Sequence, residues 1–97
     1  MRIRVIESGG LAGLRRERVV ETAELTASVR GELERLLGAA AFFARPRRHV
    51  SGLPDVIQYR VRVEDGAHVH EIVFDDEAAD EPLVALVRCV LAVRVAG

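Results

Sequence analysis

The start of the chain alternates between apolar and polar positions, as a strand with one buried face does. In residues 2–8, Ile3 and Val5 fall on one side, and the arginines with Ile6 fall on the other. Residues 15–22 (RRERVVET) predict a second strand, antiparallel to the first. Because its first half is heavily charged, we expect this strand to form a solvent-facing edge of a sheet.

The spacing of apolar residues changes to a helical period over residues 25–40. Thr26 is placed to cap the N-terminus of this helix. Six apolar positions fall on one face: Leu25, Val29, Leu33, Leu36, Leu37 and Ala40. Phe42 and Phe43 follow the helix, and we expect both rings to fill the core. Residues 44–54 (ARPRRHVSGLP) contain two prolines and show no period, which predicts a loop without a regular element.

Residues 57–74 carry the clearest strand signals in the chain. Residues 57–64 alternate strictly, and Asp65-Gly66 is a strong hairpin signal. The return strand covers residues 68–74, with His70, Ile72 and Phe74 on one face. The carboxylates of Asp75, Asp76 and Glu77 follow it. We interpret them as a solvated turn, because they lack the ligand spacing of a calcium-binding loop.

A final helix is predicted over residues 81–94, with Asp80 as its N-cap and Pro82 in its first turn. Its buried stripe consists of Leu83, Leu86, Val87, Val90 and Leu91, with Cys89 at the edge of that stripe. Together, these elements predict one α+β domain over residues 1–97 with the order ββαββα. The economical arrangement is a four-stranded, mainly antiparallel sheet with two helices packed on one face. The other face would then be polar and rich in arginine.

The composition argues against several classes of protein. The chain has 97 residues and a net charge of −1, so it lacks the basic surplus of a nucleic-acid-binding protein. No apolar run approaches the ~20 residues needed to span a membrane, and the N-terminus enters a strand pattern without the apolar core of a signal peptide. Cys89 is the single cysteine, so no internal disulfide forms, and we expect a cytoplasmic protein.

The chain shows no recognisable catalytic machinery or cofactor motif, which argues against an enzyme. Its serines do not lie in a GxSxG nucleophile elbow, and His49 is only a loop neighbour of Ser51. His68 and His70 point to one face of a strand, where they either line the sheet surface or, with a third ligand, bind a metal. The arginines at positions 45, 47 and 48 fit solvent or an acidic partner surface better than phosphate, given the near-neutral charge.

Two loops remain as candidates for recognition of a partner. The first, residues 8–14 (SGGLAGL), holds three glycines and displays Leu11 and Leu14, which the loop alone cannot bury. These leucines either dock into a pocket of another molecule or fold back onto the sheet. The second loop ends in Leu53-Pro54-Asp55, just before the third strand. In the order ββαββα, both loops could lie at the same end of the sheet.

Several short motifs follow one another in a specific order along the chain. They are Ile3-Arg4-Val5, SGGLAG at residues 8–13, Ala41-Phe42-Phe43, Pro54-Asp55 with Tyr59, Val63-Glu64-Asp65-Gly66, Val73-Phe74-Asp75-Asp76 and the leucine-rich final helix. Their order and spacing resemble the emfourin family, whose opening is typically SGGFAG. Members of that family are small bacterial inhibitors of thermolysin-like, or protealysin-like, zinc metalloproteases. The resemblance covers nearly the whole chain.

The resemblance implies a cytoplasmic protein that blocks a protease cleft with two neighbouring loops. It implies that Asp55 coordinates the catalytic zinc of the protease and that Leu11 enters a substrate subsite, with Leu14 and Leu53 as helpers. The remaining contact residues would be Gly9, Gly10, Ala12, Gly13 and Pro54. Leu11 stands where phenylalanine is frequent in the family, so the subsite contact would differ in shape. The inhibitor itself would need no cofactor, because the zinc belongs to the protease.

Other interpretations stay open at this point. Without the family resemblance, the residues favour Asp55 as a turn or capping carboxylate before the third strand. The polar sheet face, including Arg60 and Arg62, could serve a non-inhibitory interaction module such as a dimeric adaptor. His68 and His70 could serve a small enzyme or a metal-binding protein.

Overall fold

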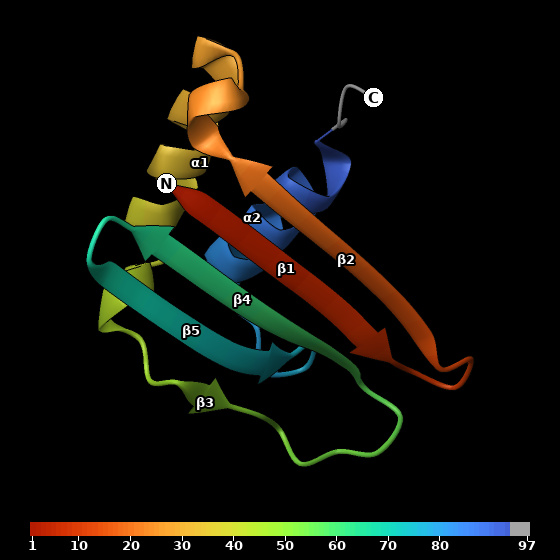
Figure 1. Ribbon diagram of the computed structural model, residues 1–97. Helices are drawn as coiled ribbons and strands as arrows, with labels where there is room; N and C mark the ends of the chain where they lie inside the picture. The colour runs from red at the N-terminus through yellow and green to blue at the C-terminus, as the bar shows by residue number, and fades with distance from the viewer. Residues whose placement is uncertain (94–97) are drawn as a thin grey trace.

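The computed structural model describes residues 1–93 as two layers, in which two helices cover one face of a five-stranded sheet (Figure 1). The strands are β1 (Arg2–Gly9), β2 (Leu14–Glu21), β3 (Arg48–His49), β4 (Ile57–Asp65) and β5 (His68–Asp75). The helices are α1 (Ala27–Ala39) and α2 (Glu81–Ala92), and the short 3-10 turns are η1 (Thr22–Glu24) and η2 (Phe42–Ala44). The α+β class and the order of the long elements are as the patterning predicts.

The strand order in the sheet is β2-β1-β4-β5-β3. The four long strands pair antiparallel, and Ile3 of β1 lies opposite Val20 on one side and Val63 on the other. This register brings the apolar positions of each alternating run to the same face, because side chains along a strand alternate between the two faces. It also makes β1 and β4 neighbours at the centre of the sheet.

The fifth strand corrects the sequence-based prediction of four strands and of a loop without regular structure over residues 44–54. β3 pairs in parallel with β5, where Arg48 lies opposite Val73 and His49 opposite Phe74. The backbone N–H of Val73 also donates to the carbonyl oxygen of Arg47, at 2.8 Å. The outer edge of β5 offers backbone groups that need partners, and the passing loop supplies them. A two-residue strand is too short to leave a period in the sequence.

The core lies between the inner face of the sheet and the two helices. The sheet contributes Ile3, Val5, Val20, Val61, Val63, Ile72 and Phe74, and the helices contribute Leu33, Leu36, Leu37, Leu83, Leu86, Val87 and Val90. These are the apolar faces that the sequence predicts, apart from Leu25, Val29 and Leu91, which are only partly buried against the core. The expectation for the two aromatics is half wrong, because Phe42 is buried but Phe43 is 38% exposed.

The helix boundaries follow from the predicted caps. The hydroxyl of Thr26 accepts a hydrogen bond from the N–H of Val29 (3.2 Å), and the carboxylate of Asp80 accepts one from the N–H of Leu83 (3.2 Å). Each cap satisfies a backbone donor that the first turn of a helix leaves without a partner. α2 ends at Ala92, and position 94, where the predicted helix ends, lies outside the described residues.

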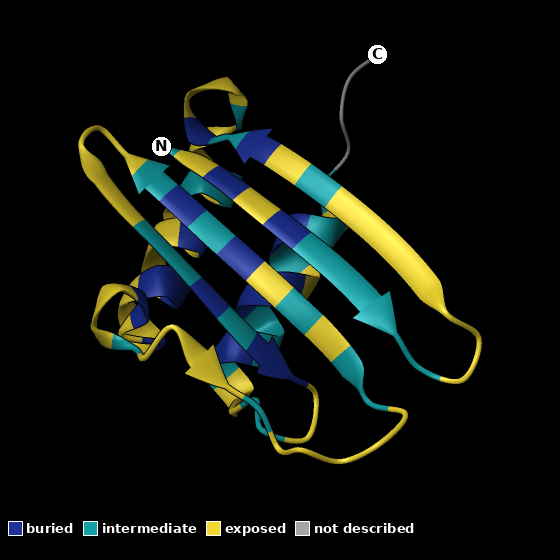
Figure 2. Cartoon of the chain, turned by 60° about the horizontal axis from the view of Figure 1, so that its bottom comes forward, coloured by how far each residue is buried: buried dark blue, intermediate teal, exposed yellow. Residues whose placement is uncertain are grey.

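The outer face of the sheet is polar and rich in arginine, as expected. Figure 2 views the sheet from this side and shows that the first half of β2 is exposed. Arginine–glutamate pairs cross the face: Arg2–Glu21, Arg4–Glu17, Arg60–Glu71 and Arg62–Glu64. Arg60 and Arg62, the residues considered for an adaptor surface, therefore already have partners within the chain. In residues 1–93, no helix is long and apolar enough to cross a membrane.

Candidate functional site

The two candidate loops lie side by side at one end of the sheet. Gly9, the last residue of β1, lies opposite Ile57, the first residue of β4. One residue further along, the N–H of Gly10 donates to the carbonyl oxygen of Val56 at 3.2 Å. The segment between β1 and β2 and the segment that leads into β4 therefore converge at the same corner of the molecule (Figure 1). Leu11 and Asp55 are each one residue away from this hydrogen bond.

Close contact between the loops requires glycine at position 9. The φ angle of Gly9 is +101°, and a Cβ added there would lie 2.8 Å from the carbonyl oxygen of Val56. That distance is shorter than a real Cβ contact, so a side chain would push the loops apart. Gly13 also has a positive φ, +62°, but an added Cβ would meet nothing within 4 Å. Its N–H donates to the carbonyl oxygen of Gly10, at 3.2 Å, and closes the turn.

The leucines of the two loops point into solvent. Leu11 is 91% exposed, Leu14 is 65% exposed and Leu53 is 53% exposed. This exposure overturns the interpretation in which the leucines of the glycine loop fold back onto the sheet. Exposed apolar side chains gathered at one end of a molecule mark a surface that can bury them against a partner.

Asp55 is exposed and has an uncommon backbone conformation. Its φ angle is +59°, in the left-handed region, where aspartate is among the few non-glycine residues that occur with some frequency. The residue belongs to a turn, as one interpretation of the sequence expects. Its carboxylate nevertheless has no hydrogen bond or ion pair with any residue between 1 and 93. The negative charge is therefore available to an external electrophile.

Two aspartates support the second loop, and the sequence pattern indicates neither of them. Asp75 is not part of a solvated turn, since it is only 1% exposed. One of its oxygens accepts hydrogen bonds from the backbone N–H (2.6 Å) and the hydroxyl (2.8 Å) of Ser51, and the other accepts one from the N–H of Ala78 (2.9 Å). Burial alone would raise the pKa of Asp75, but the hydrogen bonds from Ser51 and Ala78 outweigh it, and the pKa is lowered.

Asp76 ties down the other end of the same loop. The N–H of Ile57 donates to the carboxylate of Asp76 at 3.2 Å, and the N–H of Asp76 donates to the carbonyl oxygen of Ile57 at 3.0 Å. Asp76 is exposed, as the solvated-turn interpretation requires, but its carboxylate is engaged. No local signal identifies either role, because the partners within the loop, Ser51 and Ile57, lie 24 and 19 residues away in the sequence.

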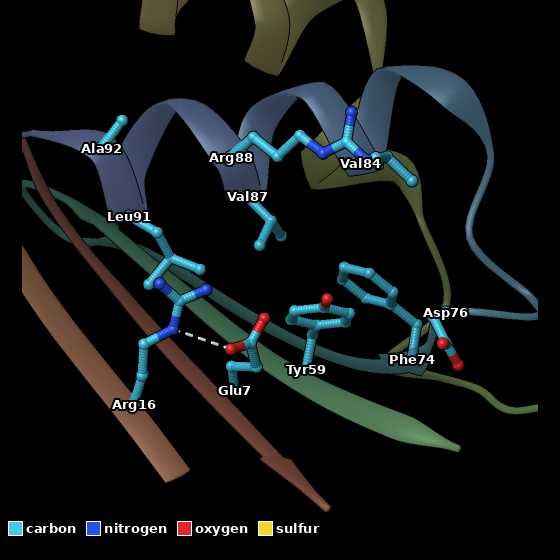
Figure 3. Close-up of a pocket in the computed structure, with 10 residues that line it drawn as sticks. All are labelled: Glu7, Arg16, Tyr59, Phe74, Asp76, Val84, Val87, Arg88, Leu91 and Ala92. Atoms are coloured by element: carbon cyan, nitrogen blue, oxygen red, sulfur yellow. Dashed lines mark hydrogen bonds and ion pairs between the residues drawn. The ribbon is translucent and has the colours of Figure 1, made fainter. Parts of the chain in front are cut away.

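Beneath this end of the sheet lies a hollow of about 500 Å³, between α2 and strands β1 and β4. Figure 3 shows Glu7 and Tyr59 pointing into it from the sheet, and Val87 and Leu91 facing them from α2. Arg16 of β2 pairs with Glu7 at 2.8 Å and lowers its pKa. Burial, and then the neighbouring Glu7, raise the pKa of Tyr59 to about 12. Among the residues that the structure describes, the lining has no serine, cysteine or histidine, so it offers no nucleophile of those types.

The histidines considered as metal ligands are used in packing. The ring of His68 stacks on Phe43 with ring centres 5.2 Å apart, and the ring of His70 meets Phe42 edge to face. Nε2 of His70 lies 2.9 Å from the carbonyl oxygen of Arg45. Within residues 1–93, no group of three or more potential metal ligands occurs. The structure therefore gives no support to a resident metal site at these histidines.

Comparison with known families, curated proteins and solved structures gives one significant match. No curated protein and no solved structure matches the chain. The profile of the emfourin family matches residues 5–91, which include both loops, all five strands except the start of β1, and nearly all of α2. A match over most of the sequence shows common descent, and it agrees with the motifs that first indicated the family. The chain belongs to the emfourin family, which is a family of protease inhibitors.

Proposed function

We propose that this protein inhibits a thermolysin-like zinc metalloprotease by inserting its two converging loops into the active-site cleft. The observation that carries the proposal is the placement of Leu11, whose side chain is exposed, and Asp55, whose carboxylate has no partner within residues 1–93, on two converging loops. The hydrogen bond between Gly10 and Val56 holds the two loops together. Family membership supports inhibition of a protease, and the chemistry of the loops supports a zinc enzyme as the target.

Asp55 would act on the metal of the protease. A catalytic zinc ion keeps one coordination position open for the water molecule that attacks the substrate. A carboxylate oxygen can occupy that position at a distance of about 2.0–2.2 Å. The attacking water is then displaced, and the carboxylate offers the enzyme no bond to cleave. An exposed carboxylate with no partner in the described chain reaches the zinc without first breaking an ion pair.

Leu11 would supply apolar contact in a neighbouring substrate subsite. Full burial of a leucine side chain contributes roughly 1.5–3 kcal/mol, and Leu11 has almost all of its surface left to bury. Nanomolar inhibition requires about −12 kcal/mol, so Leu11 and Asp55 cannot act alone. Leu14, Leu53 and Pro54, all exposed, are the neighbours that would extend the contact towards a standard interface of ~1,600 Å².

The test is a titration of a thermolysin-like protease with the protein, with hydrolysis of a short fluorogenic peptide as the readout. We expect stoichiometric loss of protease activity with the wild-type protein. Asp55→Asn keeps the size and the tolerance for a left-handed backbone but removes the charge, and it should weaken inhibition by about 100-fold, or about 2.7 kcal/mol. Asp65→Asn is the matched control, because Asp65 is an exposed aspartate at the opposite end of the sheet.

A protease whose zinc is replaced by cobalt makes the zinc contact directly visible. The visible absorption of the cobalt ion changes when a ligand at the metal changes. We expect the wild-type protein and Asp65→Asn to shift this spectrum and Asp55→Asn to leave it unshifted at saturating concentration. Inhibition by Asp55→Asn equal to that of the wild type would show that Asp55 is not the zinc ligand.

A further inference from the structure

The segment 51–57, which carries Leu53 and Asp55, is exposed over its first five residues but fixed at both ends. At its start, Asp75 binds Ser51 through two hydrogen bonds. At its end, Asp76 and Ile57 exchange two hydrogen bonds. Two consecutive carboxylates at the end of β5 therefore close the segment into a loop with fixed endpoints.

The hydrogen bonds of Ser51 also extend to the backbone of the loop. The hydroxyl of Ser51 donates to the carboxylate of Asp75 at 2.8 Å and accepts a hydrogen bond from the N–H of Leu53 at 3.2 Å. Asp75 thus acts on the backbone of Leu53 through one intervening hydroxyl. Because Asp75 is almost fully buried, its carboxylate is not a surface group that a partner could reach.

Beyond these ties, the loop is held at Val56, whose carbonyl oxygen accepts the N–H of Gly10. Residues 52–55 have no hydrogen bond within the described chain other than the one at the N–H of Leu53. The endpoints therefore decide how much conformational freedom this stretch retains. A loop that is already ordered loses less freedom when it binds, so fixed endpoints favour faster and tighter association.

We propose that Asp75 and Asp76 are positioning residues, which hold segment 51–57 in its binding conformation before the protease arrives. They act through Ser51 and Ile57, and Asp75 touches no part of the partner. This inference rests on the proposed function, because it assigns the two carboxylates a role in presenting Asp55 and Leu53 to the protease.

The experiment uses Ser51→Ala, which removes the hydroxyl that links Asp75 to Leu53 and leaves the sheet unchanged. We expect NMR order parameters of the backbone at residues 52–55 to fall in the free protein. We expect the rate constant for association with a thermolysin-like protease to fall by about 5-fold, and Ser51→Thr to restore both values. Asp75→Asn should have a larger effect, about 10- to 30-fold, because an amide has one acceptor oxygen and cannot accept from both Ser51 and Ala78, as the carboxylate does.

Val29→Ala serves as the control for a general loss of stability, because Val29 lies on α1 and is packed, partly buried, against the core. It should lower the melting temperature and leave the association rate unchanged. Unchanged order at residues 52–55 in Ser51→Ala, or lower order with unchanged association, would overturn the positioning role while the proposed function stands. A wild-type protein that fails to inhibit would instead overturn the proposed function, and the positioning role with it.

Discussion

The two loops of the candidate site are built on different physical principles. The glycine loop between β1 and β2 is held by the turn bond between Gly13 and Gly10 and by the bond from Gly10 to Val56. The loop before β4 is anchored at both ends by buried or engaged carboxylates. The first loop displays an almost fully exposed leucine, and the second displays a charge.

The difference matches what each side chain would have to do. Coordination of a metal tolerates little error in distance or direction, so a carboxylate that serves as a ligand benefits from a fixed backbone. Burial of a leucine is non-directional, and a glycine-rich loop can adapt the side chain to subsites of different shape. The proposed function thus combines one anchored and one adaptable contact at the same corner.

The strongest way to break this arrangement is to separate the two loops. Gly9→Ala would place a Cβ 2.8 Å from the carbonyl oxygen of Val56, at a φ angle of +101°. We expect inhibition to weaken by about 50-fold. We also expect the melting temperature to fall by about 5–15 °C, since strain of one to a few kcal/mol has this effect in a domain of this size.

Gly13→Ala is the matched control for this change. Its φ angle is also positive, but an added Cβ meets no atom within 4 Å. It should lower the melting temperature by only about 4–8 °C, as left-handed strain of about 1 kcal/mol predicts, and inhibition should change little. Equal effects of the two substitutions on inhibition would show that the contact between the loops is unimportant.

A smaller loss of inhibition is expected when only the apolar contact of Leu11 is reduced. Leu11→Ala should weaken inhibition by about 10-fold or somewhat more, because it removes part of the 1.5–3 kcal/mol that a buried leucine contributes. The melting temperature should stay the same, because Leu11 is exposed in the free protein. Val69→Ala provides the control, since Val69 is an exposed apolar residue on β5. An unchanged inhibition constant for Leu11→Ala would remove this residue from the contact surface.

The smallest expected effect is a local loosening of the loop before β4 at low pH. The pKa of Asp75 is lowered in the fold, so its contribution to stability is complete above its ordinary pKa of 3.8 and is lost as pH falls through the folded value. We expect the protection of the backbone amides of Ser51 and Leu53 against hydrogen exchange to fall below about pH 4, before protection in the glycine loop does. Asp75→Asn should abolish this pH dependence. Simultaneous loosening of both loops would indicate global unfolding instead of release of the anchored loop.

Much of the fold can be predicted because its signals are local. The alternation in residues 57–64, the hairpin at Asp65-Gly66 and the caps Thr26 and Asp80 each depend on neighbours within a few residues. The sequence also identifies both candidate loops, since glycine, proline and unburied leucines are visible without a structure. The family motifs point to Asp55 and Leu11 within them.

The rest depends on contacts between distant parts of the chain. β3 forms because β5 offers a free edge, and its own two residues carry no period. The convergence of the loops follows from the pairing of β1 with β4, which the patterning leaves open. Asp75 resembles a surface carboxylate in the sequence, but it is buried, and two of its hydrogen bonds come from Ser51, 24 residues earlier in the chain.

The position of the two loops outside the core has an evolutionary consequence. The buried core residues come from the strands and helices, from η2 and from Ala40 just after α1, and none lies within residues 10–13 or 51–56. Substitutions at Leu11, Ala12 and Leu53 should therefore leave the fold intact. This requires that Gly9 and the hydrogen bonds at Ser51 and Ile57 remain. A lineage with this architecture can follow a changing protease by exchanging a few exposed side chains, without redesigning its interior.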